Sequence, residues 1–378
     1  MSQQWIEVEA AALASNMRVF RELAGDDVLL APVVKSNGYG HGIQIASRSF
    51  VDGGADWLCV HEHAEAEAVA ALGVDVPILQ LGPVDPERIA EALRLGIHLT
   101  LSEPSRLEQV LAVAGSESLT AHIHLKVETG TWRQGADAER LSRMLELLAA
   151  HPGAELVGMH SHFANIEDTT RHEFAASQIH RFGELLRLAR EFGCEPRLRH
   201  FASSAATLLF PHTHFDLVRP GIASYGYWPS RETLVSARAS GADPVRLTPA
   251  LTWKSVLTEI KPVEAGSYIG YGCTDKVEVA TRMAIVPVGY ADGYRRAMGG
   301  RAHALVGGRR CPVRGRICMN LIMVDVGHVP DVSVGDEVVL LGAHGNELID
   351  AETLADWAQT LHYEVLAGLN PAIERRVV

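Results

Sequence analysis

The chain has 378 residues, of which 47% are hydrophobic and 21% are charged, a composition typical of a globular protein with material for two domains. A formal net charge of −12 disfavours a nucleic-acid partner, because a polyanion would meet a repelling surface. The five cysteines are widely spaced and form no CxxC pair, which disfavours a disulfide framework and a thiolate zinc site. We also find no signal-peptide pattern and no apolar run of membrane-spanning length, so we expect a cytoplasmic protein without membrane contact.

Short runs rich in Val, Ile and Leu alternate with amphipathic stretches that end at glycine between residues 28 and 221, which indicates β/α units. The expected strands cover residues 28–35, 57–60, 76–82, 98–101, 120–129, 154–163, 196–204 and 215–221. Such a repeat closes into a ring or forms an open doubly wound sheet. Eight units in about 200 residues favour an α/β fold of the (β/α)8 TIM-barrel type.

The remainder of the chain has a different pattern, in which expected strands are separated by turns. The expected elements are strands over 252–263, 281–288, 322–326 and 337–341 and one helix near 351–359. Residues 5–9 alternate like a strand that could join the same sheet. We therefore expect a barrel domain over residues 11–230 and a mainly β domain over 231–378, with the N-terminal strand 1–10 added to it.

The reactive groups of a TIM barrel lie where its strands end. Lys35 closes the first expected strand, and desolvation there would lower its pKa and make its amine a nucleophile, although an isolated lysine more often snorkels at the surface. Ser204, Gly221 and Ile222 follow the last two strands, where barrels of this kind bind phosphate. Arg219 closes the eighth strand.

A second interpretation rests on histidines two residues apart. His122 and His124 precede Lys126, and His160 and His162 end the next strand, as in a metal-dependent hydrolase with a carbamylated lysine. That site would place its His-x-His on the first strand and an acid on the last, whereas Lys35 and Arg219 stand there. His61 and His63 begin a helix, and we expect them on its solvated face.

Five motifs in order resemble those of the alanine racemases, pyridoxal-phosphate (PLP) enzymes with an N-terminal barrel and a C-terminal β domain, along nearly the whole chain. The first is Val-Val-Lys-Ser-Asn-Gly-Tyr-Gly-His-Gly at 33–42, which contains Lys35. The second is Gly-Tyr-Gly around Tyr271, and the others cover residues 289–296, 315–320 and 362–364.

The resemblance implies a cofactor site for PLP, with Lys35 in Schiff-base linkage. The other residues that it places around the cofactor are Tyr39, Ser204, Gly221, Ile222 and Tyr363 near the phosphate, Arg219 at the pyridine nitrogen and His162 near the ring. No metal ion is implied.

The resemblance also implies racemisation of alanine by two bases, Lys35 and Tyr271, on opposite faces of Cα. Because Tyr271 would reach the barrel of a second copy, the active protein is expected to be a head-to-tail homodimer. The small amino-acid substrate would be held through its carboxylate by Arg133 and the backbone N–H of Met319. Lys126 would be carbamylated to hold Arg133, and Tyr290 would line the entrance with Tyr363.

The chain departs from the family pattern at three single positions and in one four-residue segment. Asn320 stands where Asp is usual, Leu321 where Gln is usual and Ser203 where Asn is usual, and Thr-Trp-Arg-Gln at 131–134 replaces Met-Gly-Arg-Leu. A serine racemase or a racemase of broader specificity is therefore the first alternative. A non-catalytic PLP carrier of the single-barrel type is another, although it would not need Tyr271 or a β domain.

Overall fold

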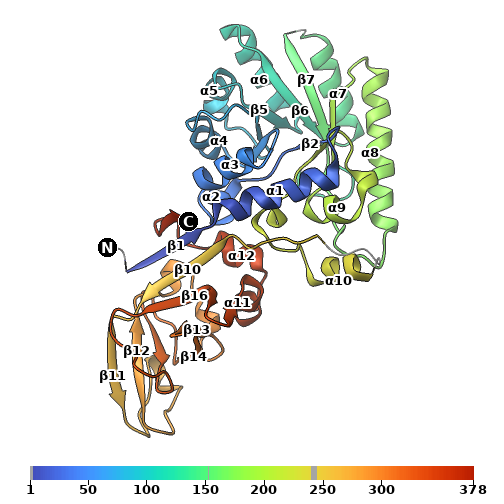
Figure 1. Ribbon diagram of the computed structural model, residues 1–378. Helices are drawn as coiled ribbons and strands as arrows, with labels where there is room; N and C mark the ends of the chain where they lie inside the picture. The colour runs from blue at the N-terminus through green and yellow to red at the C-terminus, as the bar shows by residue number, and fades with distance from the viewer. Residues whose placement is uncertain (1–2, 152, 240–244) are drawn as a thin grey trace. The chain divides into compact units, whose positions relative to one another are not determined.

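The computed structural model of the chain describes residues 3–151, 153–239 and 245–378 (Figure 1). Residue contacts divide the chain into two compact units. The barrel unit comprises Ala11–Gly38 and Ala46–Pro249, and the β unit comprises Ala250–Val378 with Tyr39–Ile45 and the N-terminal segment that ends at Ala10. Residues 1–2 and 240–244, which belong to the expected β domain, lie outside the described residues.

Eight parallel strands form the sheet of the barrel unit. They are β2 (Leu29–Leu30), β3 (Leu58–Val60), β4 (Ile78–Gln80), β5 (His98–Leu101), β6 (Ala121–Lys126), β7 (Ala154–His160), β8 (Leu198–His200) and β9 (Leu217–Val218). Neighbours follow chain order from β3 to β9, and β9 pairs with β2. A parallel bridge between Val33 and Cys59 joins the continuation of β2 to β3 and closes the ring. The predicted eight-stranded barrel is confirmed.

The barrel strands are shorter than the apolar runs that predict them. All three residues of β3 and all four of β5 are buried, as expected for parallel strands covered on both faces. The ladder of β2 ends at Leu30, although the backbone N–H groups of Ala31 and Val33 still donate to Val218 and Pro220. The predicted runs therefore continue past regular pairing into the loops that present side chains at the strand ends.

Helices surround these strands, and Figure 1 shows α6, α7 and α8 alongside β5, β6 and β7. The helical elements of the N-terminal two-thirds of the chain are α1 (Ala10–Ala24), α2 (Lys35–Tyr39), α3 (Ile43–Asp52), α4 (His63–Ala70), η1 (Pro86–Arg88), α5 (Ile89–Arg94), α6 (Pro104–Glu117), α7 (Ala138–Ala149), α8 (Glu173–Glu191), α9 (Ser204–Leu209), η2 (Pro211–Thr213), η3 (Ile222–Tyr225) and α10 (Arg231–Ala239). In α8, Phe182, Leu185 and Ala189 are buried on one face, and Gly193 follows with φ +71. None of the helices that the structure describes is long and apolar enough to cross a membrane.

The β unit is built on a sheet in which nearly all pairs are antiparallel. Its elements are β1 (Gln4–Val8), β10 (Leu251–Val256), β11 (Glu259–Val263), η4 (Tyr271–Cys273), β12 (Thr281–Val286), η5 (Tyr290–Asp292), η6 (Arg296–Met298), β13 (His303–Val306), β14 (Arg309–Arg314), β15 (Ile322–Asp325), β16 (Glu337–His344), β17 (Glu347–Ile349), α11 (Ala351–Ala358), α12 (His362–Ala367) and β18 (Glu374–Val377). The sheet order is β11-β12-β15-β14-β13-β16-β10-β1-β18, with β17 on β16. The mainly β character is confirmed, and β1 joins this sheet beside β10 as expected.

One expected strand is wrong in detail. Residues 252–263 form two strands, β10 and β11, that pair with different neighbours: β10 lies between β1 and β16, whereas β11 pairs with β12. The N–H groups of Leu257 and Thr258 between them already donate to different neighbours, the carbonyl of Asp336 directly before β16 and that of Ile285 in β12. Alternation of apolar residues continues through such a change of partner and does not reveal it.

Candidate active site

Lys35 follows the segment that continues β2, two residues after the Val33–Cys59 bridge and directly before an unusual left-handed turn. Ser36, Asn37, Gly38 and Tyr39 all have positive φ, between 49 and 61, and the N–H of Gly38 donates to Val34 O over 2.9 Å. Each non-glycine residue in this conformation costs about 1–2 kcal/mol. Glu65 of α4 accepts a hydrogen bond from the Ser36 N–H at 2.5 Å and helps to hold the turn. Backbone strain of this kind is typical of functional sites.

Four cations influence one another at this end of the barrel. Burial and the nearby Arg133 charge lower the pKa of Lys35. Burial, followed by Arg133 and Arg219, lowers the pKa of Lys126 to about 7. Burial and the charges of the same arginines and lysines also keep the pKa of His162 well below its ordinary value. The predicted residues Lys35, Lys126, Arg133, His162 and Arg219 therefore share one strongly positive region, which suits anionic groups.

Arg219 is only 6% exposed and has no carboxylate partner among the described residues. Its guanidinium donates to Ser161 O over 2.8 Å and to Nδ1 of His200. Burial lowers its pKa to about 10, so it remains a cation near neutral pH. A buried charge without an anion is expensive, which indicates that this guanidinium is retained for a group that the chain itself does not supply.

A column of histidine rings continues from Arg219 through the barrel. His200 Nε2 lies 2.9 Å from His124 Nδ1, and His124 Nε2 lies 3.3 Å from His98 Nδ1. Burial keeps the pKa values of His124 and His200 well below the ordinary value and lowers that of His98 to about 3, so the rings are neutral. Because Arg219 can only donate, His200 must donate to His124, and His124 to His98. The column thus fixes the orientation of Arg219.

Ser204, Gly221 and Ile222 lie together where the last two barrel strands end. Ser204 is the first residue of α9, and its Oγ accepts from Gly221 N at 2.8 Å and from Ala223 N at 3.3 Å. Ile222 begins η3 and is fully buried. A hydroxyl and several backbone N–H groups in one place are typical of a phosphate site.

The other predicted site residues belong to the β unit. The ring of Tyr39 lies 6.5 Å from that of Tyr363, between ring centres. Tyr290 N donates to Cys318 O, and Ala291 N donates to Met319 O, so the loops of Tyr290 and Met319 are joined. Tyr271 is 70% exposed and Met319 is 56% exposed, so both side chains are accessible on the β unit.

A buried carboxylate shapes the loop that carries Arg133. Glu128 accepts hydrogen bonds from the N–H groups of Gly130, Thr131 and Trp132 at 2.5, 2.7 and 3.0 Å. Trp132 has φ +53, and its side chain is 80% exposed. Lys126 donates to Gln134 Oε1 over 3.2 Å. The loop is therefore pinned at its base.

Comparison with known proteins assigns nearly the whole chain to one protein family. The family model described as alanine racemase, N-terminal domain, matches residues 8–229, and the model of the C-terminal domain matches residues 250–377. The chain belongs to the alanine racemase family. This result supports the racemase interpretation and neither the metal-dependent hydrolase nor the PLP carrier.

Relatives of this family resemble the chain over almost its full length. It is 37% identical to the alanine racemase of Leptospira interrogans serovar Lai over 376 residues, which cover 99% of this chain and 95% of the relative. It is 38% identical to that of Desulforamulus reducens over 373 residues, 98% of each chain. Among solved structures, the alanine racemase from Bacillus anthracis with bound L-Ala-P has a TM-score of 0.92 at 32% identity, covering 100% of this chain and 95% of that chain.

Sequence reasoning missed several residues of this site. Glu128 was not singled out, because its hydrogen bonds to the N–H groups of Gly130, Thr131 and Trp132 depend on the path of the loop. His98 and His200 were also missed, because each is a lone histidine in an apolar strand. His61 is exposed as expected, whereas the expectation for His63 is wrong: this side chain is buried.

Proposed function

We propose that the protein is an amino-acid racemase that interconverts L- and D-alanine with PLP as cofactor. Membership of the alanine racemase family carries this proposal together with one structural observation: Lys35 has a lowered pKa and stands among Lys126, Arg133 and Arg219. A serine racemase or a racemase of broader specificity is the alternative.

The residues present fit PLP. Four cations suit its phosphate and the substrate carboxylate, and the hydroxyl of Ser204 with the N–H groups near Gly221 suits the phosphate in particular. Arg219 has no carboxylate partner among the described residues. Its guanidinium therefore suits a hydrogen bond that it donates to the pyridine nitrogen. The proposed cofactor residues are Lys35, Tyr39, His162, Ser204, Arg219, Gly221, Ile222 and Tyr363. When bound, PLP would acidify the Cα–H of an attached amino acid by delocalising charge into its ring.

The chain's own groups then have separate tasks. Lys35 removes or returns a proton at one face of Cα, and burial, which lowers its pKa, favours its neutral amine more than in an ordinary lysine; Tyr271 acts at the opposite face. Arg133 and the N–H of Met319 orient the carboxylate. Lys126, with its pKa near 7, is partly neutral and able to form a carbamate that holds Arg133.

A head-to-tail homodimer forms part of the proposal. Tyr271 and Met319 expose large side chains on the β unit, and Tyr290 is also exposed. Groups of this kind suit insertion into a second copy, where Tyr271 would meet the substrate. All five cysteines are free, which suits the cytoplasm as the proposed location.

Reduction of the PLP-loaded protein with borohydride followed by peptide mapping tests the cofactor residue. We expect the pyridoxyl group on Lys35 and none in Lys35→Ala. An adduct on Lys126 or another lysine would overturn the assignment. Release of deuterium from Cα-deuterated D-alanine then tests the reaction, and PLP binding without any such release would favour the carrier.

A further inference from the structure

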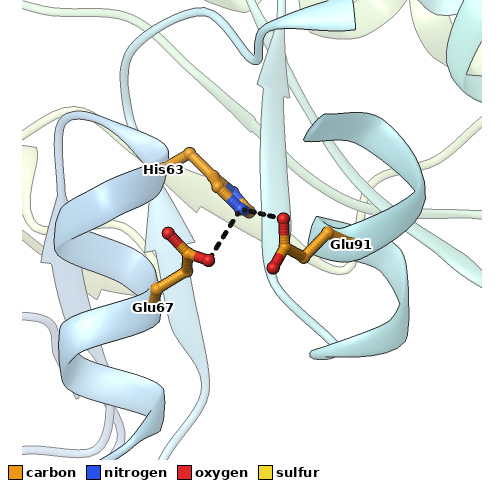
Figure 2. A group of neighbouring side chains, drawn as sticks. All are labelled: His63, Glu67 and Glu91. Carbon is orange, nitrogen blue, oxygen red and sulfur yellow. Dashed lines mark ion pairs between the residues drawn. The ribbon is translucent and has the colours of Figure 1, made fainter. Parts of the chain in front are cut away.

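Three side chains outside the proposed active site converge between α4 and α5 of the barrel unit (Figure 2). His63 and Glu67 lie one turn apart on α4, and Glu91 extends from α5. Figure 2 shows the His63 ring pointing between the two carboxylates. One donor atom from each residue lies within 4.8 Å of the others.

His63 distinguishes this group from an ordinary acidic cluster. Its side chain is only 8% exposed, yet neither ring nitrogen has a hydrogen-bond partner of ordinary geometry among the described residues. Buried polar groups normally have such partners, since leaving one unpaired costs about 1–3 kcal/mol. A buried imidazole that points at two carboxylates without a good hydrogen bond to either is suited to share a cation with them.

The spacing of the donor atoms indicates a cation. His63 Nε2 lies 3.4 Å from Glu91 Oε2 and 3.7 Å from Glu67 Oε1, longer than good hydrogen bonds. Donors bound about 2.0–2.1 Å from a tetrahedral zinc ion are about 3.3–3.4 Å apart, so both separations are close to an edge of that tetrahedron. Two neighbouring carboxylates also repel each other until a positive charge lies between them.

We propose that His63, Glu67 and Glu91 bind one divalent transition-metal ion, with Zn²⁺ as the best match. One imidazole nitrogen with two carboxylate oxygens is a donor set that zinc accepts, with a fourth position left for water. Ca²⁺ and Mg²⁺ prefer six or more oxygen ligands and suit this set less well.

Arg88 is the competing cation. It donates to Glu91 Oε2 over 2.7 Å, and this hydrogen bond lowers the pKa of Glu91. Arg88 is exposed and its pair with Glu91 is a surface pair, which contributes little to stability. A zinc ion can therefore take the carboxylate from it.

The proposed ion would connect two helices near the Lys35 turn. Glu65, two residues after His63 on α4, accepts hydrogen bonds from the N–H groups of Ser36 and His61. A metal that ties α4 to α5 would therefore stiffen the helix that holds the residue after Lys35. Its role would be structural, since none of its three ligands is a proposed racemase residue.

Zinc binding to the full-length, untagged, PLP-loaded protein tests the proposal after removal of metal with a chelator. Titration of Zn²⁺ in competition with a zinc-responsive dye should give one ion per chain. Glu67→Gln and Glu91→Gln are each expected to weaken binding at least about tenfold, because each removes a ligand charge. Zinc should also raise Tm of the wild type by a few degrees and have little effect on Glu91→Gln.

Two matched variants serve as controls. His180 and Glu184 form an exposed histidine–glutamate pair at the same spacing on α8, without a third ligand, so His180→Gln should leave zinc binding unchanged. Arg88→Gln removes the competing cation and no ligand, and should retain or tighten binding. Absence of stoichiometric zinc in the wild type, or equal affinity in Glu91→Gln, would overturn the site in favour of a plain ion-pair cluster of protonated His63.

Discussion

Tyr271 stands between two glycines with φ +70 and +80, a backbone that projects its side chain from the β unit. We predict that Tyr271→Phe retains PLP but slows proton transfer at one face of Cα by about 10²–10⁴-fold, the usual contribution of one acid or base. Deuterium incorporation from solvent, measured separately from L- and D-alanine, should reveal the asymmetry. Tyr268→Phe, at another exposed tyrosine three residues earlier, is the control. Equal slowing from both enantiomers would indicate a structural role for Tyr271.

A second prediction at the scale of single residues concerns the pH dependence of Lys126 carbamylation. A carbamate forms only from the neutral amine, and a pKa of about 7 makes that form abundant near neutral pH, whereas an ordinary lysine with a pKa near 10.4 is almost fully protonated there. Carbamylation should therefore increase as pH rises through 7. A carbamate carbon signal in NMR with ¹³C-bicarbonate, absent from Lys126→Met, measures it. Lys254, whose pKa is raised by its pairs with Glu7 and Glu337, should give no such signal; an unchanged signal in Lys126→Met would refute the assignment.

The histidine column gives a prediction at the scale of elements, because it crosses β5, β6 and β8. His98→Phe retains the ring between Trp57 and His122 but leaves His124 Nε2–H without its acceptor. The free energy of unfolding should fall by about 1–3 kcal/mol. His122→Phe retains the stacked ring and loses only a partly exposed pair with Glu155, so it should cost less than about 1 kcal/mol. Urea denaturation of both variants measures these free energies of unfolding. Equal losses in the two variants would mean that the hydrogen bond between His124 and His98 contributes nothing to stability.

Several elements could be predicted from sequence for a physical reason, and others could not. Buried parallel strands require continuous apolar runs, so all eight barrel strands were found. The β13–β14 hairpin was not named, although Gly307 and Gly308 supply the two positive φ values of a tight turn and would have indicated it. The division of residues 252–263 depends on which strands lie beside them, information that no local pattern contains. The burial of His63 likewise depends on α5, which lies more than twenty residues further along the chain.

At the scale of the whole molecule, the residues of the proposed function are distributed over both units of the chain. Lys35, Arg133 and Arg219 belong to the barrel unit, whereas Tyr271 and Met319 belong to the β unit. The ordered motifs contain Lys35, Tyr271 and Met319, and the family resemblance implied Arg133 and Arg219. Apolar periodicity and strand counting identify elements within one unit and therefore could not have connected these residues, and the expected domain limits and homodimer remain predictions.

Substrate choice depends on several of the proposed site residues together. Tyr363 is half-buried beside Tyr39 and places a large ring where the resemblance puts the entrance, which favours a small side chain. Asn320 and Leu321, next to Met319, replace a charge and an amide that are usual in the family, which loosens selection near the carboxylate. Serine differs from alanine by one hydroxyl, and a pocket that selects by size discriminates against such a group by only about 1–3 kcal/mol. We therefore predict that kcat/KM for serine is about 10–200-fold below that for alanine, and that lysine is turned over poorly. Kinetics with alanine, serine and lysine measure this order, and a preference for lysine would show that Tyr363 does not limit the entrance.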